Sequence, residues 1–305
     1  MPNARSRQLA TLLLVSVTAV WGSTFFLIRD VVRQLSPADF LAVRFTIAAV
    51  VITAVFWRQV RRLDRRELTV GAGLGVLYGV AQVLQTVGLA HTDASRSGFI
   101  TGTYVVLTPV FGAVLLRDRV PRSTWLAVGM ATAGLAALSL RGVGFGYGEL
   151  LTLASAAVYA LHIIGLGRYS SSGSASGLAA VQVVVIALVC LVCAAPGGVE
   201  MPSGTGPWLS VLYMALVAGA VAMWAQTWAQ SHLPATRAAI VMTLEPVFAA
   251  AFAVTLGSES LTAPMLLGGA LVVGAMYVVE LVGRKDTGAT AAQEPPAEAL
   301  HHEVS

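Results

Sequence analysis

The stretch QTVGLAHTDASR at residues 85–96 returns in altered form as QTWAQSHLPATR at residues 226–237. Four residue pairs share one spacing of 141 positions: Gln85 and Gln226, His91 and His232, Ala94 and Ala235, and Arg96 and Arg237. The chain has only five histidines, so this agreement favours duplication over chance. Just downstream, LTPVFGA (107–113) resembles LEPVFAA (244–250) at a spacing of 137 positions. Weak internal symmetry of this kind is typical of folds built from two structural repeats.

Composition indicates that the repeats lie in a membrane. Hydrophobic residues make up 56% of the chain and charged residues 11%, whereas soluble proteins carry about 25% charged residues. A helix that crosses the hydrocarbon core needs about 20 predominantly apolar residues, because lipid offers the backbone no hydrogen-bond partner. Ten such stretches are predicted, at residues 9–28, 38–57, 69–89, 96–116, 125–140, 148–167, 178–195, 208–230, 235–256 and 262–281. The sequence thus predicts an all-α membrane protein with ten transmembrane helices.

Five predicted spans fall in each repeat, and an odd number makes the second repeat enter the membrane from the opposite side. The expected organisation is a first five-helix repeat at 9–140 and a second at 148–281. A cytoplasmic amino terminus (1–8) and a disordered cytoplasmic tail (282–305) flank them. Inverted repeats around a central cavity are a transporter architecture, because the two ends of one site can open alternately.

The basic residues predict the orientation in the membrane. Fourteen of the nineteen lie in loops and ends on the side of the amino terminus and four on the other side, with Arg44 inside a span. By the positive-inside rule, both termini are expected in the cytoplasm of a multi-pass inner-membrane protein. The basic residues are scattered and lack an aromatic platform, so no nucleic-acid partner is expected.

Four segments resemble one known family. They are AVWGSTFFLIRDV (19–31), ADFLAVRFTIAA (38–49), GLAHTDASRSGFITGTYVVLTPVFGAVLLRDR (88–119) and LPATRAAIVMTLEPVFAAAFAVTLGSE (233–259). In order and duplication they are similar to the EamA-type repeats of the drug/metabolite transporter superfamily, and the resemblance covers about residues 10–281. It implies a ten-helix bundle with a central cavity that exports, or occasionally takes up, small metabolites. One departure is Asp118 in LLRDRVP, where the first repeat of the family often carries Leu-x-Glu.

Polar side chains at helical spacing mark the helix faces turned away from lipid. Such stripes occur in the third, fourth and sixth predicted helices, and the first contributes WGST (21–24). The candidate substrate-binding residues among them are Gln82, Gln85, Tyr104, Thr108, Tyr159, His162, Trp21 and Thr24. The alternative is that small and hydroxyl residues only pack helices together, as Gly71, Gly75 and Gly79 of the third helix suggest by their spacing.

Two charges lie inside predicted spans, Arg44 in the second and Glu245 near the centre of the ninth. A charge at mid-bilayer costs roughly 2.5–3.5 kcal/mol on insertion scales, so such residues are presumed functional unless they pair. Arg44 and Glu245 are near enough in depth to pair, but helical side chains lean toward their own amino terminus, which separates them. Both possibilities stay open. Burial favours the protonated form of Glu245, so changing access to water could load and release a proton.

Two prolines lie inside apolar spans, Pro109 and Pro246. Each removes a backbone hydrogen bond and is expected to break the helix, freeing a carbonyl four residues earlier. A broken helix near the midplane is the usual place for a transport site. The plainer alternative is that the prolines only shape helix packing.

The leading hypothesis is a secondary transporter that moves a small metabolite, amino acid or drug-like molecule by alternating access, as a proton-coupled exporter. Glu245 is then the site of a proton or of a cationic substrate. An uncoupled facilitative carrier is the alternative, in which Glu245 holds Arg44 or a substrate amine. A polytopic lipid-modifying enzyme is a remote third, because Asp, Glu and His do not cluster at one membrane surface. No enzyme activity, cofactor or metal is expected, and the partners are the substrate, protons and lipid. Oligomeric state does not follow from the sequence.

Overall fold

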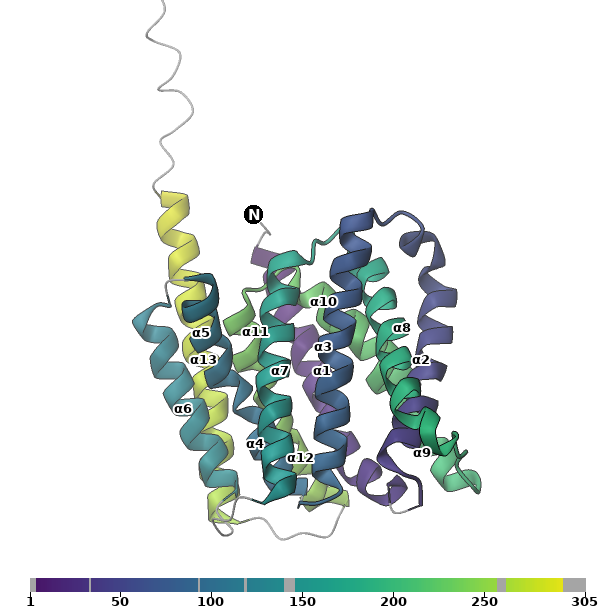
Figure 1. The fold of residues 1–305 in the computed structure, drawn as a ribbon. Helices are drawn as coiled ribbons and strands as arrows, with labels where there is room; N and C mark the ends of the chain where they lie inside the picture. Colours follow the sequence, from purple (N-terminus) through teal and green to yellow (C-terminus); the bar gives the residue numbers. More distant parts are fainter. Residues whose placement is uncertain are drawn as a thin grey trace, which may run out of the picture.

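A computed structural model of the chain describes residues 4–32, 34–92, 94–117, 120–139, 146–256 and 262–292, and these form a bundle of helices (Figure 1). Up to residue 139 the helices are α1 (Ala4–Val31), α2 (Pro37–Val60), α3 (Arg65–Leu89), α4 (Ala94–Gly102), α5 (Tyr104–Leu116) and α6 (Arg122–Ser139). From residue 147 onward they are α7 (Tyr147–Tyr169), α8 (Ala175–Ala194), α9 (Thr205–Ala215), α10 (Ala222–Gln230), α11 (Ala235–Met242), α12 (Leu244–Leu256) and α13 (Ala263–Ala292). Two short helices join them, η1 (Ala195–Gly197) after α8 and η2 (Leu216–Val221) between α9 and α10.

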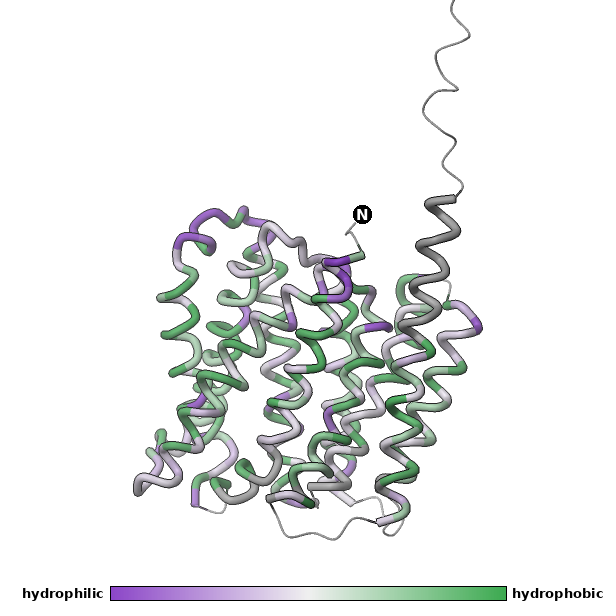
Figure 2. Tube along the Cα trace, turned by 180° about the vertical axis from the view of Figure 1, so that it is seen from behind, coloured by the Kyte–Doolittle hydropathy of each residue, from purple (hydrophilic) through white to green (hydrophobic). Residues whose placement is uncertain are grey.

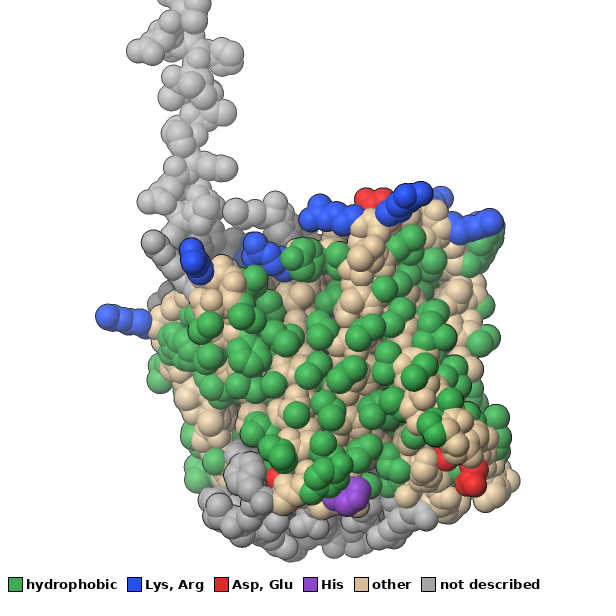
Figure 3. All heavy atoms as spheres, viewed as in Figure 1, with side chains coloured by type: hydrophobic (Ala, Val, Ile, Leu, Met, Phe, Trp, Pro, Cys, Tyr) green, Lys and Arg blue, Asp and Glu red, His purple; other side chains and the backbone are tan. Residues whose placement is uncertain are grey.

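Helix length and hydropathy make this a multi-pass membrane protein. Six described helical stretches are long and apolar enough to cross a bilayer: Pro37–Val60, Arg65–Leu89, Tyr147–Tyr169, Ala175–Gly197, Thr205–Gln230 and Ala235–Phe252. Shorter apolar helices run over Ile100–Leu116 and Leu266–Val278. Hydrophilic residues gather at the two ends of the bundle (Figure 2), and hydrophobic side chains cover its flank (Figure 3).

The two ends of the bundle differ in charge. The amino terminus, the loop between α2 and α3 and the last turns of α13 lie at one end (Figure 1). Lysine and arginine side chains are concentrated on that rim (Figure 3), and the exposed arginines around the α2–α3 loop belong to it. Asp64 caps α3 there, because its carboxylate accepts a hydrogen bond from the Glu67 backbone N–H while Glu67 accepts one from the Asp64 N–H. The charged end is therefore also locally ordered.

The helices of the two halves have matching neighbours. α3 packs against α7 as α10 packs against α1, and α12 packs against α1 as α4 and α5 pack against α7. α2 packs against α8, and α6 against α13, which pairs each helix with its counterpart from the other half. α1 begins at the upper end of the bundle and α7 at the lower end (Figure 1). The packing thus follows one pattern of neighbours in both halves of the chain.

Two polar details repeat at the same spacing. Thr11 donates a hydrogen bond to the Arg7 carbonyl in α1, and Thr152 donates one to the Gly148 carbonyl in α7. Both threonines and both acceptors are 141 positions apart, the spacing already seen between Gln85 and Gln226. The register of the duplication therefore extends to the first helix of each half.

The interruptions of the helices do not lie at the prolines. The break between α4 and α5 is at Thr103, and the break between α11 and α12 is at Thr243. Each threonine hydroxyl donates to an isoleucine carbonyl three residues earlier, at 2.6 Å from Ile100 and 2.6 Å from Ile240. Such local bonds compete with regular helix geometry. The break at Thr243 directly follows Met242, whose carbonyl Pro246 cannot bond, whereas the break at Thr103 lies two residues before Val105, whose carbonyl Pro109 cannot bond.

Both prolines follow the break instead. Pro109 lies inside α5, six residues beyond Thr103, and Pro246 lies in the first turn of α12. Proline is tolerated in the first turn of a helix, because backbone nitrogens there have no carbonyl partner within the helix. Measured from the break, the two Pro-Val-Phe copies are therefore three residues out of register.

Glycines of α3 bring it close to α8. A Cβ on Gly75 would lie 2.7 Å from the Val185 Cβ, and one on Gly71 would lie 2.9 Å from Val181. Gly79 meets Val189 in the same way at 3.0 Å. The small-residue spacing of this helix therefore serves helix packing.

Candidate functional site

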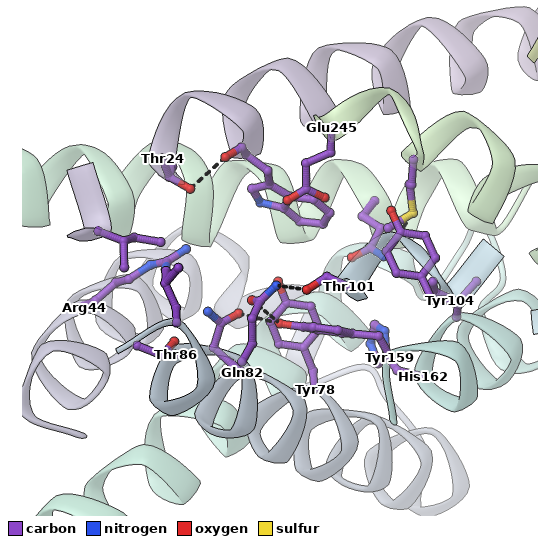
Figure 4. Close-up of a pocket in the computed structure, with 17 residues that line it drawn as sticks. Thr24, Arg44, Tyr78, Gln82, Thr86, Thr101, Tyr104, Tyr159, His162 and Glu245 are labelled. Atoms are coloured by element: carbon purple, nitrogen blue, oxygen red, sulfur yellow. Dashed lines mark hydrogen bonds between the residues drawn. The ribbon is translucent and has the colours of Figure 1, made fainter. Parts of the chain in front are cut away.

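A polar cavity lies between α1, α2, α3, α4, α5, α7, α10, α11 and α12 (Figure 4). Nine of the ten candidate binding residues line it: Trp21, Thr24, Arg44, Gln82, Gln85, Tyr104, Tyr159, His162 and Glu245. Thr108 does not. Residues outside that candidate set also contribute to the wall, namely Ile28, Tyr78, Thr86, Leu89, Thr101, Ile163, Gln226 and Met242. The polar stripes of separate helices thus converge on one space.

Thr108 is displaced by the register of its helix. It is buried and its hydroxyl forms no hydrogen bond in the described part of the chain. Thr108 is five residues beyond the break at Thr103, whereas Glu245 is two beyond the break at Thr243. Three residues correspond to about 4.5 Å along a helix. Similar sequence therefore does not give these two residues equivalent positions.

One wall of the cavity is a hydrogen-bonded group from α3, α4 and α7. The Tyr159 hydroxyl lies 2.9 Å from Gln82 Oε1 and 3.1 Å from Gln85 Oε1, and it donates to this pair of oxygens. The Gln85 amide in turn donates to the Thr101 hydroxyl at 3.1 Å. Buried polar groups joined in this way stiffen a site, because each fixes the orientation of the next.

Tyr78 supports that wall through aromatic contacts. Its ring meets Tyr159 edge to face at 5.3 Å between centroids and meets His162 at 5.1 Å. A third edge contact joins it to Phe45 of α2 at 6.5 Å. Aromatic edge-to-face pairs add about 0.5–1.5 kcal/mol each beyond burial. Tyr78 therefore connects α2 and α7 at the depth of the cavity.

Arg44 is held by a backbone carbonyl and not by a carboxylate. It is 3% exposed, and its Nε donates to the Met214 carbonyl of α9 at 3.2 Å. Its guanidinium carbon lies 4.9 Å from the centre of the Phe45 ring, a cation–π distance. Within the described residues Arg44 and Glu245 form no ion pair, and Figure 4 shows them on separate parts of the wall. Both line one cavity without touching.

The π-helix η2 lies where α1 meets the α9–α10 column. The Trp21 indole N–H donates to the Ala218 carbonyl inside η2 at 2.9 Å. A π turn shifts the backbone bonding pattern by one residue, and such turns are frequent at functional sites. Thr24 donates to the Trp21 carbonyl at 2.8 Å. Side chains of α1 and α2 are thus tied to backbone carbonyls of α9 and η2.

Glu245 is the anionic group of the cavity. It lies in the first turn of α12, directly after the break at Thr243, and its side chain is partly accessible. No hydrogen bond or ion pair of its carboxylate is present in the described part of the chain. Its backbone is fixed by α1, since a Cβ on Gly22 would lie 2.8 Å from the Glu245 carbonyl oxygen. The helix is closely packed while the carboxylate is left free.

Gln226 is a cavity residue that the sequence could have predicted directly. It is the repeat counterpart of Gln85, and both line the same cavity. Gln182 of α8, which hydrogen-bonds His162 at 2.9 Å, gives no comparable signal, because it is isolated in an otherwise apolar helix. A repeat can thus identify one residue of a site and miss another.

An apolar bundle around a cavity with many polar side chains in its wall is the architecture of a multi-pass membrane transporter. The chain matches the EamA-like transporter family over residues 8–140 and 146–281, and it belongs to that family. The two matched segments correspond to the two halves that share their helix neighbours.

Two similar proteins are named as transporters. A protein of Archaeoglobus fulgidus named as an uncharacterized transporter is 32% identical over 275 residues, covering 90% of this chain and 87% of the relative. YedA of Escherichia coli, named as an uncharacterized inner membrane transporter, is 25% identical over 288 residues, covering 91% and 93%. A protein crystal structure with 20% sequence identity has a TM-score of 0.76 and covers 91% of this chain and 98% of that chain. This last similarity shows a shared fold.

Proposed function

We propose that the protein is a secondary transporter that moves a small metabolite across the inner membrane by alternating access. Ten crossings result when α4 with α5, α9 with η2 and α10, and α11 with α12 are each counted as one membrane span. The matching neighbours of the two halves support two inverted five-helix repeats around the cavity. The concentration of basic residues on the rim that carries the amino terminus and the end of α13 supports cytoplasmic termini (Figure 3).

The free carboxylate of Glu245 carries this proposal. An ionised carboxylate without a partner loses favourable interactions with water when it is partly buried. It is stabilised either by taking a proton or by holding a cation, and a cavity that opens alternately to two sides allows both to exchange. Glu245 is thus the residue through which a proton gradient would drive export.

The test is Glu245→Gln, which keeps the shape of the side chain and removes its charge. Wild type and variant are reconstituted in proteoliposomes that contain a pH-sensitive dye, and a set of amino acids, amines and nucleobases is added under an imposed pH gradient. A compound that moves protons with the wild type is expected to move none with the variant. Glu200→Gln makes the same chemical change on an exposed residue that does not line the cavity and is expected to behave as wild type. Unchanged proton movement in Glu245→Gln would remove Glu245 from the coupling.

Facilitated diffusion is the second candidate. Because Arg44 is bound to the Met214 carbonyl, Glu245 is free to hold a substrate amine without titrating. In that case flux of the compound follows its own gradient and ignores an imposed pH gradient. Measuring the flux at equal and unequal pH distinguishes the two candidates.

A further inference from the structure

Two chains of hydrogen bonds end at the wall of the cavity, and each starts on a backbone carbonyl. The first starts at Leu178. Its carbonyl can only accept, so the group of Gln182 that faces it at 3.3 Å is the amide N–H₂. This nitrogen also faces the Thr227 hydroxyl at 3.3 Å, whose own proton is donated to the Met223 carbonyl. The orientation of the Gln182 amide is therefore fixed.

The fixed amide determines the tautomer of His162. Gln182 Oε1 lies 2.9 Å from His162 Nε2, and since the amide oxygen only accepts, Nε2 carries the hydrogen. In the neutral ring Nδ1 is then an acceptor. It is fully buried and has no hydrogen-bond partner in the described part of the chain.

The second chain starts at Ile163 of α7. Its carbonyl accepts from Gln230 Nε2 at 3.0 Å, so Gln230 Oε1 is the group that faces Gln226. Gln226 Nε2 donates to that oxygen at 3.1 Å and also lies 3.8 Å from the Met242 sulfur. Gln226 Oε1 is left as a buried acceptor without a partner among the described residues.

Glu245, Gln226 and His162 all line the same cavity, and we call their three free groups the acceptor cluster. It consists of the carboxylate, the amide oxygen and the ring Nδ1. Buried acceptors without a donor are destabilising, so native structures seldom leave them unpaired without a reason. The nearby cation, Arg44, is bound to the Met214 carbonyl and lies on another part of the wall. Arg44 Nη1 and the Tyr104 hydroxyl line the same cavity, but they have no hydrogen-bond partner among the described residues and so satisfy none of these acceptors. The cluster therefore combines one negative charge with acceptors that no donor of the described chain satisfies.

We infer that the acceptor cluster binds the protonated primary amine of a substrate and discriminates against a quaternary ammonium group. A primary ammonium has a positive charge that balances the carboxylate of Glu245. It also has three N–H donors, one for each member of the cluster. A quaternary ammonium has the same charge but no N–H, so the buried acceptors stay unpaired. The inference rests on the proposed function only in placing the substrate in this cavity, and it does not depend on proton coupling.

The experiment compares two probes of equal charge on the purified full chain in detergent. They are 2-phenylethylammonium and its N,N,N-trimethyl derivative, whose ring suits a cavity lined by Tyr78, Tyr104 and Tyr159. Titration calorimetry at pH 7 is expected to give at least tenfold tighter binding of the primary amine. Equal affinity of the two probes, tighter binding of the trimethyl probe, or no binding of either would overturn the inference.

Gln226→Leu and His162→Phe test the two neutral acceptors separately. Each is expected to weaken binding of the primary amine at least fivefold and to leave binding of the trimethyl probe unchanged, so the discrimination falls. Gln59→Leu removes an exposed glutamine at the end of α2 and is the control. If Gln226→Leu does not fold, as judged by its melting temperature, Gln226→Met takes its place. Loss of affinity for both probes in equal measure would contradict a role for the acceptors.

The result is separable from the test of coupling. Equal binding of both probes, together with loss of proton movement in Glu245→Gln, would overturn the acceptor cluster and keep the proton-coupled transporter. Selective binding of the primary amine, together with flux that ignores pH, would keep the cluster and remove the coupling.

Discussion

Replacing Gly75 by alanine tests whether the close approach of α3 and α8 holds the bundle together. The added Cβ would lie 2.7 Å from the Val185 Cβ and 2.8 Å from the Gln182 carbonyl oxygen. Carbon atoms in contact prefer about 3.5–4.0 Å. Since one of these neighbours is backbone, the two helices must move apart. Overpacking of this kind costs about 1–3 kcal/mol.

Gly73→Ala is the matched control, two residues away in the same helix. A Cβ there meets nothing within 4 Å, and the residue is exposed. Both variants gain the same helix propensity, about 0.5–1 kcal/mol, so the difference between them isolates the overpacking.

Thermal unfolding in one detergent at one scan rate measures the difference, because membrane proteins unfold irreversibly and a midpoint depends on the rate. With about 2 °C per kcal/mol for a chain of this size, Gly75→Ala should melt roughly 2–6 °C below Gly73→Ala. Equal midpoints, or a higher midpoint for Gly75→Ala, would show that α3 and α8 are not packed as described.

Two further substitutions and one fusion test the site and the rim. Tyr159→Phe removes the hydroxyl that donates to Gln82 and Gln85, and the two amide oxygens left without a donor should lower the stability by about 1–3 kcal/mol. The protein should therefore melt at a lower temperature than the control Tyr169→Phe, which changes an exposed tyrosine. Trp21→Phe keeps an aromatic ring but loses the bond to η2, so substrate flux should fall while the protein stays folded; full flux would contradict a role for that bond. A carboxyl-terminal alkaline phosphatase fusion should be inactive in a bacterial host, because the enzyme folds only outside the cytoplasm; an active fusion would reverse the proposed orientation.

The sequence predicted the class of this fold because the solvent imposes it. Apolar stretches of the required length predicted a membrane protein, and the duplication around Gln85 and Gln226 predicted two related halves. The family match over two segments agrees with both predictions. The boundaries of the two repeats and of the tail remain predictions. α13 continues to Ala292, past the expected end of the last span, and residues 293–305 lie outside the described part of the chain, as do residues 1–3 and Asp118.

The site was predictable where polarity and periodicity coincide. Gln82, Gln85 and Tyr159 follow helical stripes, and lipid gives such side chains no alternative to the interior. Whether Arg44 contacts Glu245 depends on how their two helices are rotated relative to each other. The periodicity of a single helix gives no information about this rotation. The breaks at Thr103 and Thr243 precede Pro109 and Pro246 by six and three residues; proline predicts an interruption in the turn before it but not this difference in spacing.

The π-helix η2 fixes the phase between α9 and α10. A π turn accommodates one residue more than an α turn, and one residue corresponds to about 100° of rotation. If the same residues of Leu216–Val221 formed a regular α-helix, the extra residue would turn α10 against α9 by that angle, whereas deleting one residue would restore a regular helix and keep their relative phase. Met214, which holds Arg44, and Gln226, which belongs to the acceptor cluster, lie on opposite sides of η2. A one-residue deletion would therefore keep the cation and the acceptor cluster in phase and change only the local carbonyl arrangement of η2, where Ala218 accepts the Trp21 hydrogen bond.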